Sequence, residues 1–177
     1  MPTVTTPPAL VAQETSSWCF AAAEVMVRSY RSLPAVLQYD IARRTTWALA
    51  ELDPAVQERW ELAEALDLSA GQREEGGANL LSQVVQLVRT QWNAFDNAAT
   101  GGRFVQHLTA ELVRTEIDND RIFVVGTAIH YYVVYGYSDD GNVLDVRDPW
   151  PAGQGGLTPR IALAEFLGLP AHVTILF

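Results

Sequence analysis

The sequence contains no lysine and only one cysteine. All twelve basic residues are arginines, a bias that we attribute to a GC-rich genome. The single cysteine, Cys19, excludes an internal disulfide and a cysteine-rich zinc site. Its thiol is therefore either a small buried hydrophobic group or a reactive one.

Long apolar runs are also missing. A membrane-spanning helix needs about 18 to 20 consecutive apolar residues, and the longest nearly apolar stretch, 122–137, is interrupted by glycine, threonine and histidine. No basic segment followed by an apolar one marks a secretory signal peptide at the N-terminus. We therefore expect no membrane insertion, and a protein that is cytoplasmic in the producing cell or is exported by a dedicated secretion system into a target cell.

Positive charge is scarce, and no cofactor motif is present. The net charge of −9 disfavours nucleic acid and other polyanions as partners. The sequence has neither a phosphate-binding loop nor a dinucleotide fingerprint, and its three histidines lack ligand-spaced neighbours. We therefore expect no cofactor and no metal. The 177 residues, 49% of them hydrophobic, suffice for one domain with a substantial core.

The first two-thirds of the chain has helical periodicity. Ser16 or Ser17 is a candidate N-cap for a helix that continues to about Arg31, before Pro34. The same spacing predicts further helices over residues 35–49, from Pro54 to about Ala63, over 81–92 and over 105–118, and it predicts loops over 71–77 and 93–102.

From Arg121 onward the pattern is that of strands. We expect strands over residues 122–129, 130–137, 143–148 and 173–177, with a short helix near 161–167. Asp140-Gly141 is a strong hairpin signal, because glycine adopts a positive φ without steric penalty. Helices followed by antiparallel strands indicate an α+β fold rather than a parallel βαβ sheet.

The position of Cys19 favours a reactive thiol. At the start of the first helix, the positive end of the helix dipole is expected to lower the thiol pKa. A lone cysteine is more often a core residue, so the residues expected around Cys19 decide whether its thiol is structural or reactive. Gln13, on the loop that enters this helix, can direct its amide at a developing oxyanion, with the Cys19 backbone N–H as second donor. A glutamine in a loop is otherwise simply solvated.

His130 and Asp148 are expected at the same end of the predicted hairpin. With Asp140-Gly141 at the tip, one register places His130 opposite position 151, and a slip of one residue places it opposite Trp150. In the second register Asp148 is the diagonal neighbour of His130, at about 7 to 8 Å between backbones, which two side chains can span. The carboxylate would fix the imidazole tautomer and leave the other nitrogen for the thiol.

Structural alternatives exist for each of these residues. His130 could be satisfied by backbone groups, and Asp148 could form a turn before Pro149. His107 and His172 compete only weakly for the role of base. His107 falls in the expected last helix with no acidic neighbour at strand-pair distance, and His172 precedes the final strand in a Pro-Ala-His segment, so both are better explained as solvated or structural histidines.

Three segments together carry a family resemblance. Gln13-x5-Cys19 with Trp18 before the thiol, then Ile-His-Tyr-Tyr-Val-Val-Tyr-Gly-Tyr, then Asp-Pro-Trp resemble the bacterial papain-like cysteine peptidases. These include relatives of the double-glycine leader peptidases and of secreted effector proteases. The resemblance extends over essentially the whole chain from Gln13 to Phe177.

The resemblance implies a single papain-like domain over residues 1–177. Its N-terminal helical lobe, about 1–100, would pack on an antiparallel β lobe, about 101–177, with the active site between them. The roles that it implies are the oxyanion hole for Gln13, the nucleophile for Cys19, the general base and acid for His130 and the orienting group for Asp148. The Cys-Gly-Ser-Cys-Trp signature of the plant and lysosomal branch is absent, and the orienting residue is aspartate rather than asparagine, so that branch is a poor guide to specificity.

The expected function is hydrolysis of a protein or peptide substrate through an acyl-enzyme. Acyltransferases and transglutaminases use the same triad, but there the base typically follows the thiol more closely than His130 follows Cys19. A non-catalytic binding module would require one triad member to be misplaced. Biologically, a bacterial effector or toxin restrained by a cognate immunity protein, a leader-peptide-processing peptidase and a housekeeping peptidase are all compatible with the sequence.

Overall fold

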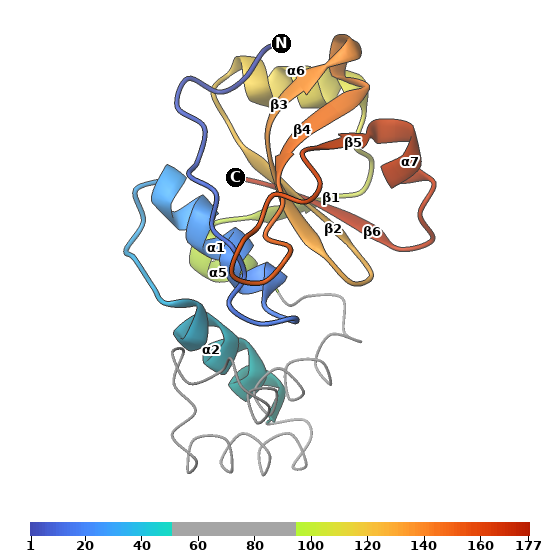
Figure 1. The fold of residues 1–177 in the computed structure, drawn as a ribbon. Coiled ribbons are helices and arrows are strands. Elements are labelled where there is room, and N and C mark those ends of the chain that lie inside the picture. The colour runs from blue at the N-terminus through green and yellow to red at the C-terminus, as the bar shows by residue number, and fades with distance from the viewer. Residues whose placement is uncertain (51–94) are drawn as a thin grey trace.

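A computed structural model describes residues 1–50 and 95–177 of the chain. The helices expected from Pro54 to Ala63 and over 81–92, and the loop expected over 71–77, lie outside the described residues. Within the described residues, the fold combines helices with a single antiparallel sheet (Figure 1). The α+β class is therefore confirmed.

The sheet has six strands in the order β1-β6-β2-β3-β4-β5, each antiparallel to its neighbours. The strands are β1 (Arg103–Val105), β2 (Phe123–Thr127), β3 (Tyr131–Ser138), β4 (Val143–Arg147), β5 (Arg160–Ala162) and β6 (His172–Leu176). β2 lies in the middle of the sheet, and its first four residues are buried. This is why its sequence is a continuous apolar run rather than an alternating one.

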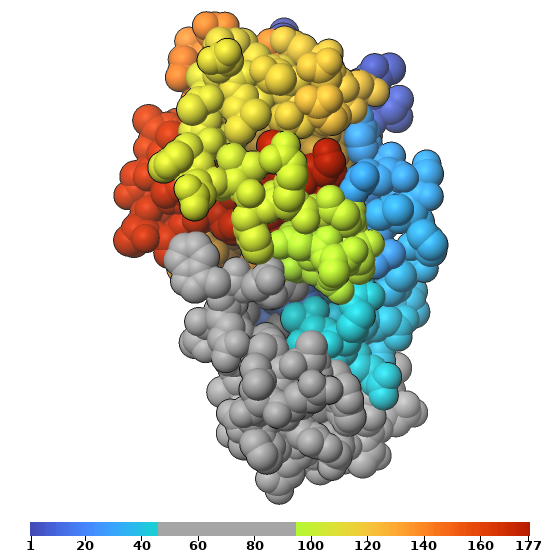
Figure 2. All heavy atoms as spheres, turned by 180° about the vertical axis from the view of Figure 1, so that it is seen from behind, coloured from blue at the N-terminus to red at the C-terminus, as the bar shows by residue number. Residues whose placement is uncertain are grey.

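Helices of very different length accompany the sheet. They are α1 (Cys19–Tyr30), α2 (Gln38–Ala50), α5 (Asn97–Thr100), α6 (Ala110–Asp118), the 3-10 turn η2 (Asp139–Gly141) and α7 (Leu163–Leu167). Seen from behind, residues 95–120 (green to yellow) form much of the surface between α1 (blue) and the C-terminal strands (red) (Figure 2). No helix in the part of the chain that the structure describes is long and apolar enough to cross a membrane.

Two expectations about the middle of the chain are wrong. The expected helix over 105–118 begins only at Ala110, because residues 103–105 pair with β6 and form the edge strand β1. The expected loop over 93–102 contains the short helix α5, whose first turn is capped by the Asp96 carboxylate. Pairing with β6 decides the first case, and the local cap by Asp96 decides the second.

Helix α1 is largely buried and lies against β3 and α2. The small residues Ala21, Ala22 and Ala23 are fully buried, so its backbone can approach its neighbours closely. Two charged residues of α1, Glu24 and Arg28, are buried. The carboxylate of Glu24 accepts from Arg28 at 2.7 Å and from Arg44 of α2 at 2.8 Å. The pair with Arg44 ties α1 to α2, whereas the pair with Arg28 lies within α1.

The N-terminal segment runs along the sheet before it reaches α1 (Figure 1). Where β2 no longer accompanies β3, Val4 N–H donates to Tyr135 and Tyr137 N–H donates to Pro2, at 2.9 and 3.0 Å. Further on, Arg147 of β4 donates to the Pro8 carbonyl at 3.0 Å. The segment is thus attached to the sheet on its way to α1.

The β3–β4 hairpin contains a bulge that sets its register. Near the tip Gly136 pairs with Asp145, whereas beyond the bulge Val133 pairs with Arg147. The bulge at Tyr135 shifts the pairing by one residue. Continued to the end of the hairpin, this pairing places His130 opposite Trp150, which is the second of the two registers expected from the sequence.

Candidate active site

Cys19 is the first residue of α1, and its side chain is fully buried. Its Sγ lies 3.9 Å from the carbonyl oxygen of Ile129, in the turn between β2 and β3. The N-cap residue is Trp18, which makes no side-chain capping bond, so the expectation of Ser16 or Ser17 at this position is wrong. The buried Trp18 ring anchors the helix start by packing, and the chain enters through a turn in which Trp18 N–H faces the Thr15 carbonyl at 3.5 Å.

His130 stands at the entrance to β3, and its side chain is 15% exposed. Its Nε2 lies 2.7 Å from Oδ1 of Asp148, which leaves Nδ1 as the ring nitrogen available to Cys19. Burial lowers the pKa of His130, but hydrogen bonds to Asp148 and to Cys19, together with the charges of both groups, outweigh it and raise the pKa to about 9. The imidazole is therefore protonated at neutral pH.

Asp148 directly follows β4 and is almost completely buried. Besides His130 it accepts two backbone bonds, from Trp150 N–H to Oδ1 at 2.8 Å and from Thr158 N–H to Oδ2 at 2.9 Å. Burial would raise the pKa of this carboxyl, but the bond from His130 and then the backbone bonds hold the pKa below its usual value. The carboxylate is therefore ionised and fixed in direction.

Gln13 is buried beside the turn that leads into α1. Its Nε2 donates to the Thr15 carbonyl at 2.6 Å, which fixes the amide and leaves its second N–H for another acceptor. Its backbone pairs with the loop after Asp148, since Gln13 N–H donates to Pro149 and Gly153 N–H donates to Gln13, both at 2.9 Å. The segments that carry Gln13 and Asp148 are thus tied together next to the start of α1.

The thiol of Cys19, the imidazolium of His130 and the carboxylate of Asp148 lie next to one another in that order. The Cys19 thiol interacts with His130, and the second nitrogen of His130 bonds to Asp148. Cys19, as the first residue of α1, directs its backbone N–H out of the helix N-terminus, where negative charge is favoured. The carboxylate thus holds one ring nitrogen of His130, and the ring interacts with the thiol of Cys19.

The other histidines lie elsewhere. His107 precedes α6 rather than lying within a helix, which corrects that expectation, and it is exposed. His172 begins β6; its ring packs on Phe166 with centroids 5.1 Å apart, and its Nδ1 lies 3.0 Å from the Leu169 carbonyl. Across residues 1–50 and 95–177, no group of three or more histidine, cysteine or acidic side chains is arranged to hold a metal ion.

Two residues that the sequence analysis overlooked support the imidazole. Oγ1 of Thr127 accepts from His130 N–H at 3.0 Å and from Ile129 N–H at 3.3 Å. Tyr132 presents its ring edge-on to the His130 ring, with centroids 4.5 Å apart. A threonine three residues before a histidine, at a strand end, is a recognisable turn pattern, so Thr127 carries a sequence signal. The contact of Tyr132 depends on the bulged register and carries none.

We expect Thr127→Val to lower the rate of any reaction that depends on His130 about tenfold with little change in KM, because the turn that carries His130 loses its acceptor while the side-chain shape is kept. Thr127→Ser retains the hydroxyl and is expected to restore most of the rate. Steady-state kinetics on both variants tests this. Equal rates for valine and serine would show that the hydroxyl does not position His130.

The pKa of His130 predicts a pH dependence. Folding favours its protonated form, so the stabilisation it provides is complete below pH 6.5 and is lost as the pH rises through about 9. The rate of any step that needs the imidazolium as an acid is expected to decline over the same alkaline range. An NMR titration of the His130 ring measures the midpoint; a value near 6.5, that of free histidine, would contradict the assigned contacts.

Comparisons of the chain with known protein families, with curated proteins and with solved structures find no match. Function is therefore inferred from the residues and their geometry.

Proposed function

We propose that the chain is a papain-like cysteine peptidase that hydrolyses peptide bonds with Cys19, His130 and Asp148. The observation that carries this proposal is the 2.7 Å contact of His130 Nε2 with Asp148, made while the same ring interacts with the thiol of Cys19. Cys19 begins α1, whereas His130 and Asp148 lie at the ends of the neighbouring strands β3 and β4, and the contacts among the three support the proposal. A structural histidine would need only one such partner.

In the proposed reaction, the Cys19 thiolate attacks the carbonyl carbon of the scissile peptide bond. The new C–S bond places negative charge on the carbonyl oxygen, which the Cys19 N–H and the second amide N–H of Gln13 would stabilise. When the C–N bond breaks, His130 gives its proton to the leaving amine. Water then attacks the thioester, His130 accepts a proton from it, and the C–S bond breaks to release the carboxylate product and the free enzyme.

Asp148 has an orienting role in this scheme. Its bonds from Trp150 and Thr158 keep Oδ1 directed at His130, so the imidazole presents its other nitrogen to the thiol and the leaving group. The depressed pKa of the Asp148 carboxyl keeps this acceptor charged at any pH at which the enzyme would act.

A labelling and cleavage experiment tests the proposal. A peptide probe with a thiol-reactive group is expected to modify wild-type protein at Cys19 near neutral pH and to leave His130→Ala much less modified. Incubation of a peptide library with wild-type protein, and with Cys19→Ala as control, should give new carboxyl termini only with the wild type. Products joined to an added primary amine instead of water would point to acyl transfer, and labelling without turnover would point to a binding module.

We expect Gln13→Ala to lower the turnover rate by roughly 10² to 10³, because one oxyanion donor contributes about 3 to 4 kcal/mol in the transition state and little in the ground state. KM should change far less. Because Gln13 is buried, the measurement includes the melting temperature of the variant. A stable variant with the wild-type rate would remove Gln13 from the oxyanion hole.

The biological setting of such a peptidase is also a proposal. We favour an effector or toxin that acts on proteins of a target cell and is inhibited by a cognate immunity protein. Expression of the active chain in one bacterial culture and of Cys19→Ala in another separates a toxin from a leader-peptide-processing or housekeeping peptidase. Only a toxin would inhibit growth in a way that depends on its activity.

A further inference from the structure

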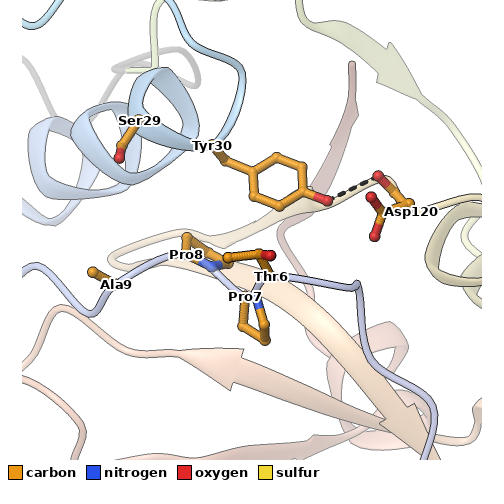
Figure 3. A pocket seen from close by; sticks show the side chains of 7 residues that line it. All are labelled: Thr6, Pro7, Pro8, Ala9, Ser29, Tyr30 and Asp120. Carbon is orange, nitrogen blue, oxygen red and sulfur yellow. Dashed lines mark hydrogen bonds between the residues drawn. The ribbon is translucent and has the colours of Figure 1, made fainter.

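A surface pocket lies at the opposite end of α1 from Cys19. It has a volume of about 500 Å³ and is formed between the N-terminal segment, the last turn of α1 and the end of α6. Its lining residues are Thr6, Pro7, Pro8, Ala9, Ser29, Tyr30 and Asp120. Figure 3 shows the Tyr30 ring reaching from α1 toward Asp120, with the two prolines and Thr6 facing it across the pocket. The volume is typical of sites for small ligands or short peptide segments.

The walls of the pocket are held in place without a ligand. The Tyr30 hydroxyl donates to the Asp120 carbonyl at 2.8 Å, and Oδ1 of Asp120 accepts from Thr5 N–H. Pro7 and Pro8 restrict the backbone of the opposite wall. A ligand would therefore meet a flat aromatic face, two proline rings and a carboxylate at fixed positions, and little side-chain freedom would be lost on binding.

The only charge among the lining residues is that of Asp120. The bond from Thr5 lowers the pKa of this carboxyl, so it is ionised at neutral pH. No ion pair to Asp120 is present among residues 1–50 and 95–177. The pocket therefore presents an uncompensated negative charge on a protein of net charge −9.

The arginines close to the pocket residues in sequence are bound elsewhere, and Arg147, which donates to the carbonyl of the lining residue Pro8, lies over the Tyr135 ring. Arg28 donates to Glu24, Arg121 donates to Glu116, and Arg31 donates to the Thr100 carbonyl and lies over the Phe177 ring. None of the lining residues is itself basic. Within residues 1–50 and 95–177, the carboxylate of Asp120 is therefore open to a cation supplied by another molecule.

Asp120 also occupies a position that disfavours it. It follows α6 with φ +58°, where glycine or asparagine is preferred, in a Schellman-type end with Asp120 N–H bonded to Ile117 and Arg121 N–H bonded to Glu116. Asp120→Asn is therefore well tolerated by the backbone, keeps the acceptor for Thr5 and removes only the charge. This makes it a clean test of the pocket.

We propose that this pocket binds an arginine side chain of a polypeptide ligand, with the guanidinium against the Tyr30 ring and bonded to the Asp120 carboxylate. Arginine fits better than lysine because its planar group stacks on aromatic rings and its donors reach the carboxylate and neighbouring hydroxyls together. The site is independent of the proposed triad and would add recognition of a basic segment distant from the catalytic residues.

The experiment is an NMR titration of the full chain carrying Cys19→Ala, which keeps binding separate from any turnover. N-acetyl-arginine amide is expected to shift the amide signals of Ser29, Tyr30 and Asp120 with an affinity on the order of millimolar, since a single side chain provides few contacts. N-acetyl-citrulline amide has the same shape without the charge and is expected to bind at least tenfold more weakly.

Asp120→Asn should weaken arginine binding at least tenfold, whereas Asp139→Asn should leave it unchanged. Asp139 is a matched control, because it is also exposed and has a positive φ but does not line the pocket. Equal shifts with arginine and citrulline, shifts spread over other acidic surfaces, or unchanged binding in Asp120→Asn would each overturn the proposal. The comparison of arginine with citrulline needs no pocket variant. It therefore tests recognition of the guanidinium charge even if Asp120→Asn were unstable. Failure of the peptidase proposal would leave all of these binding results unaffected.

Discussion

Cys19→Ala is expected to reduce peptide hydrolysis by roughly 10⁵-fold or more, because the acyl-enzyme cannot form and catalysis falls to what binding and the oxyanion donors supply. The fold should survive, since alanine is tolerated at a helix start and the chain has no disulfide to lose. Turnover measured with a cleavable peptide, alongside circular dichroism, tests this. Hydrolysis by a folded Cys19→Ala variant at more than a small fraction of the wild-type rate would exclude Cys19 as the nucleophile.

His130→Ala is the companion variant. It separates the ionisation of the Cys19 thiol from the access of a reagent to its sulfur. Because Cys19 is fully buried, a small alkylating reagent reaches its sulfur only when the surroundings open. The labelling rate of the wild type therefore depends both on how often the surroundings of Cys19 open and on the fraction of Cys19 that is thiolate. Loss of the imidazole should slow alkylation at neutral pH as well as turnover, since the thiolate loses its cationic partner. Equal alkylation rates in wild type and variant would show that His130 does not activate the thiol.

Asp148→Ala is expected to lower turnover by roughly 10² to 10⁴, because His130 loses the acceptor that fixes its tautomer. It should also lower stability by about 1 to 3 kcal/mol, since the N–H groups of Trp150 and Thr158 lose their buried partner. Steady-state kinetics and thermal unfolding measure the two effects separately. Near-wild-type turnover in a folded Asp148→Ala variant would leave Cys19 and His130 as a dyad.

Asp148→Asn should retain more activity than Asp148→Ala but less than the wild type. An asparagine Oδ1 can still accept from His130 and Trp150. Its Nδ2, however, would face Thr158 N–H, so two donors meet where the carboxylate provided an acceptor. If asparagine and alanine gave the same activity, the oxygen at this position would not act through His130.

The sequence determined the local features of this protein. The helical spacing before Pro34 predicts α1 with Cys19 at its start, and Asp140-Gly141 predicts the tip of the β3–β4 hairpin. Both signals are local, because helix periodicity and turn chemistry depend on residues close in the chain. The α+β class followed from the order of these segments. Thiol chemistry is likewise indicated by residue types alone, those at Gln13, Cys19, His130 and Asp148.

Only the tertiary structure decided how these residues meet. The choice between the two hairpin registers depends on the bulge at Tyr135, which lies beside the attached N-terminal segment and has no pattern of its own. The edge strand β1 exists because β6 supplies its partners. The bond from Thr158 to Asp148 closes a ten-residue loop, and the Asp120 pocket joins three segments that are distant in the chain. Such contacts depend on which surfaces are buried together, and that is a property of the whole folded chain rather than of any local sequence window.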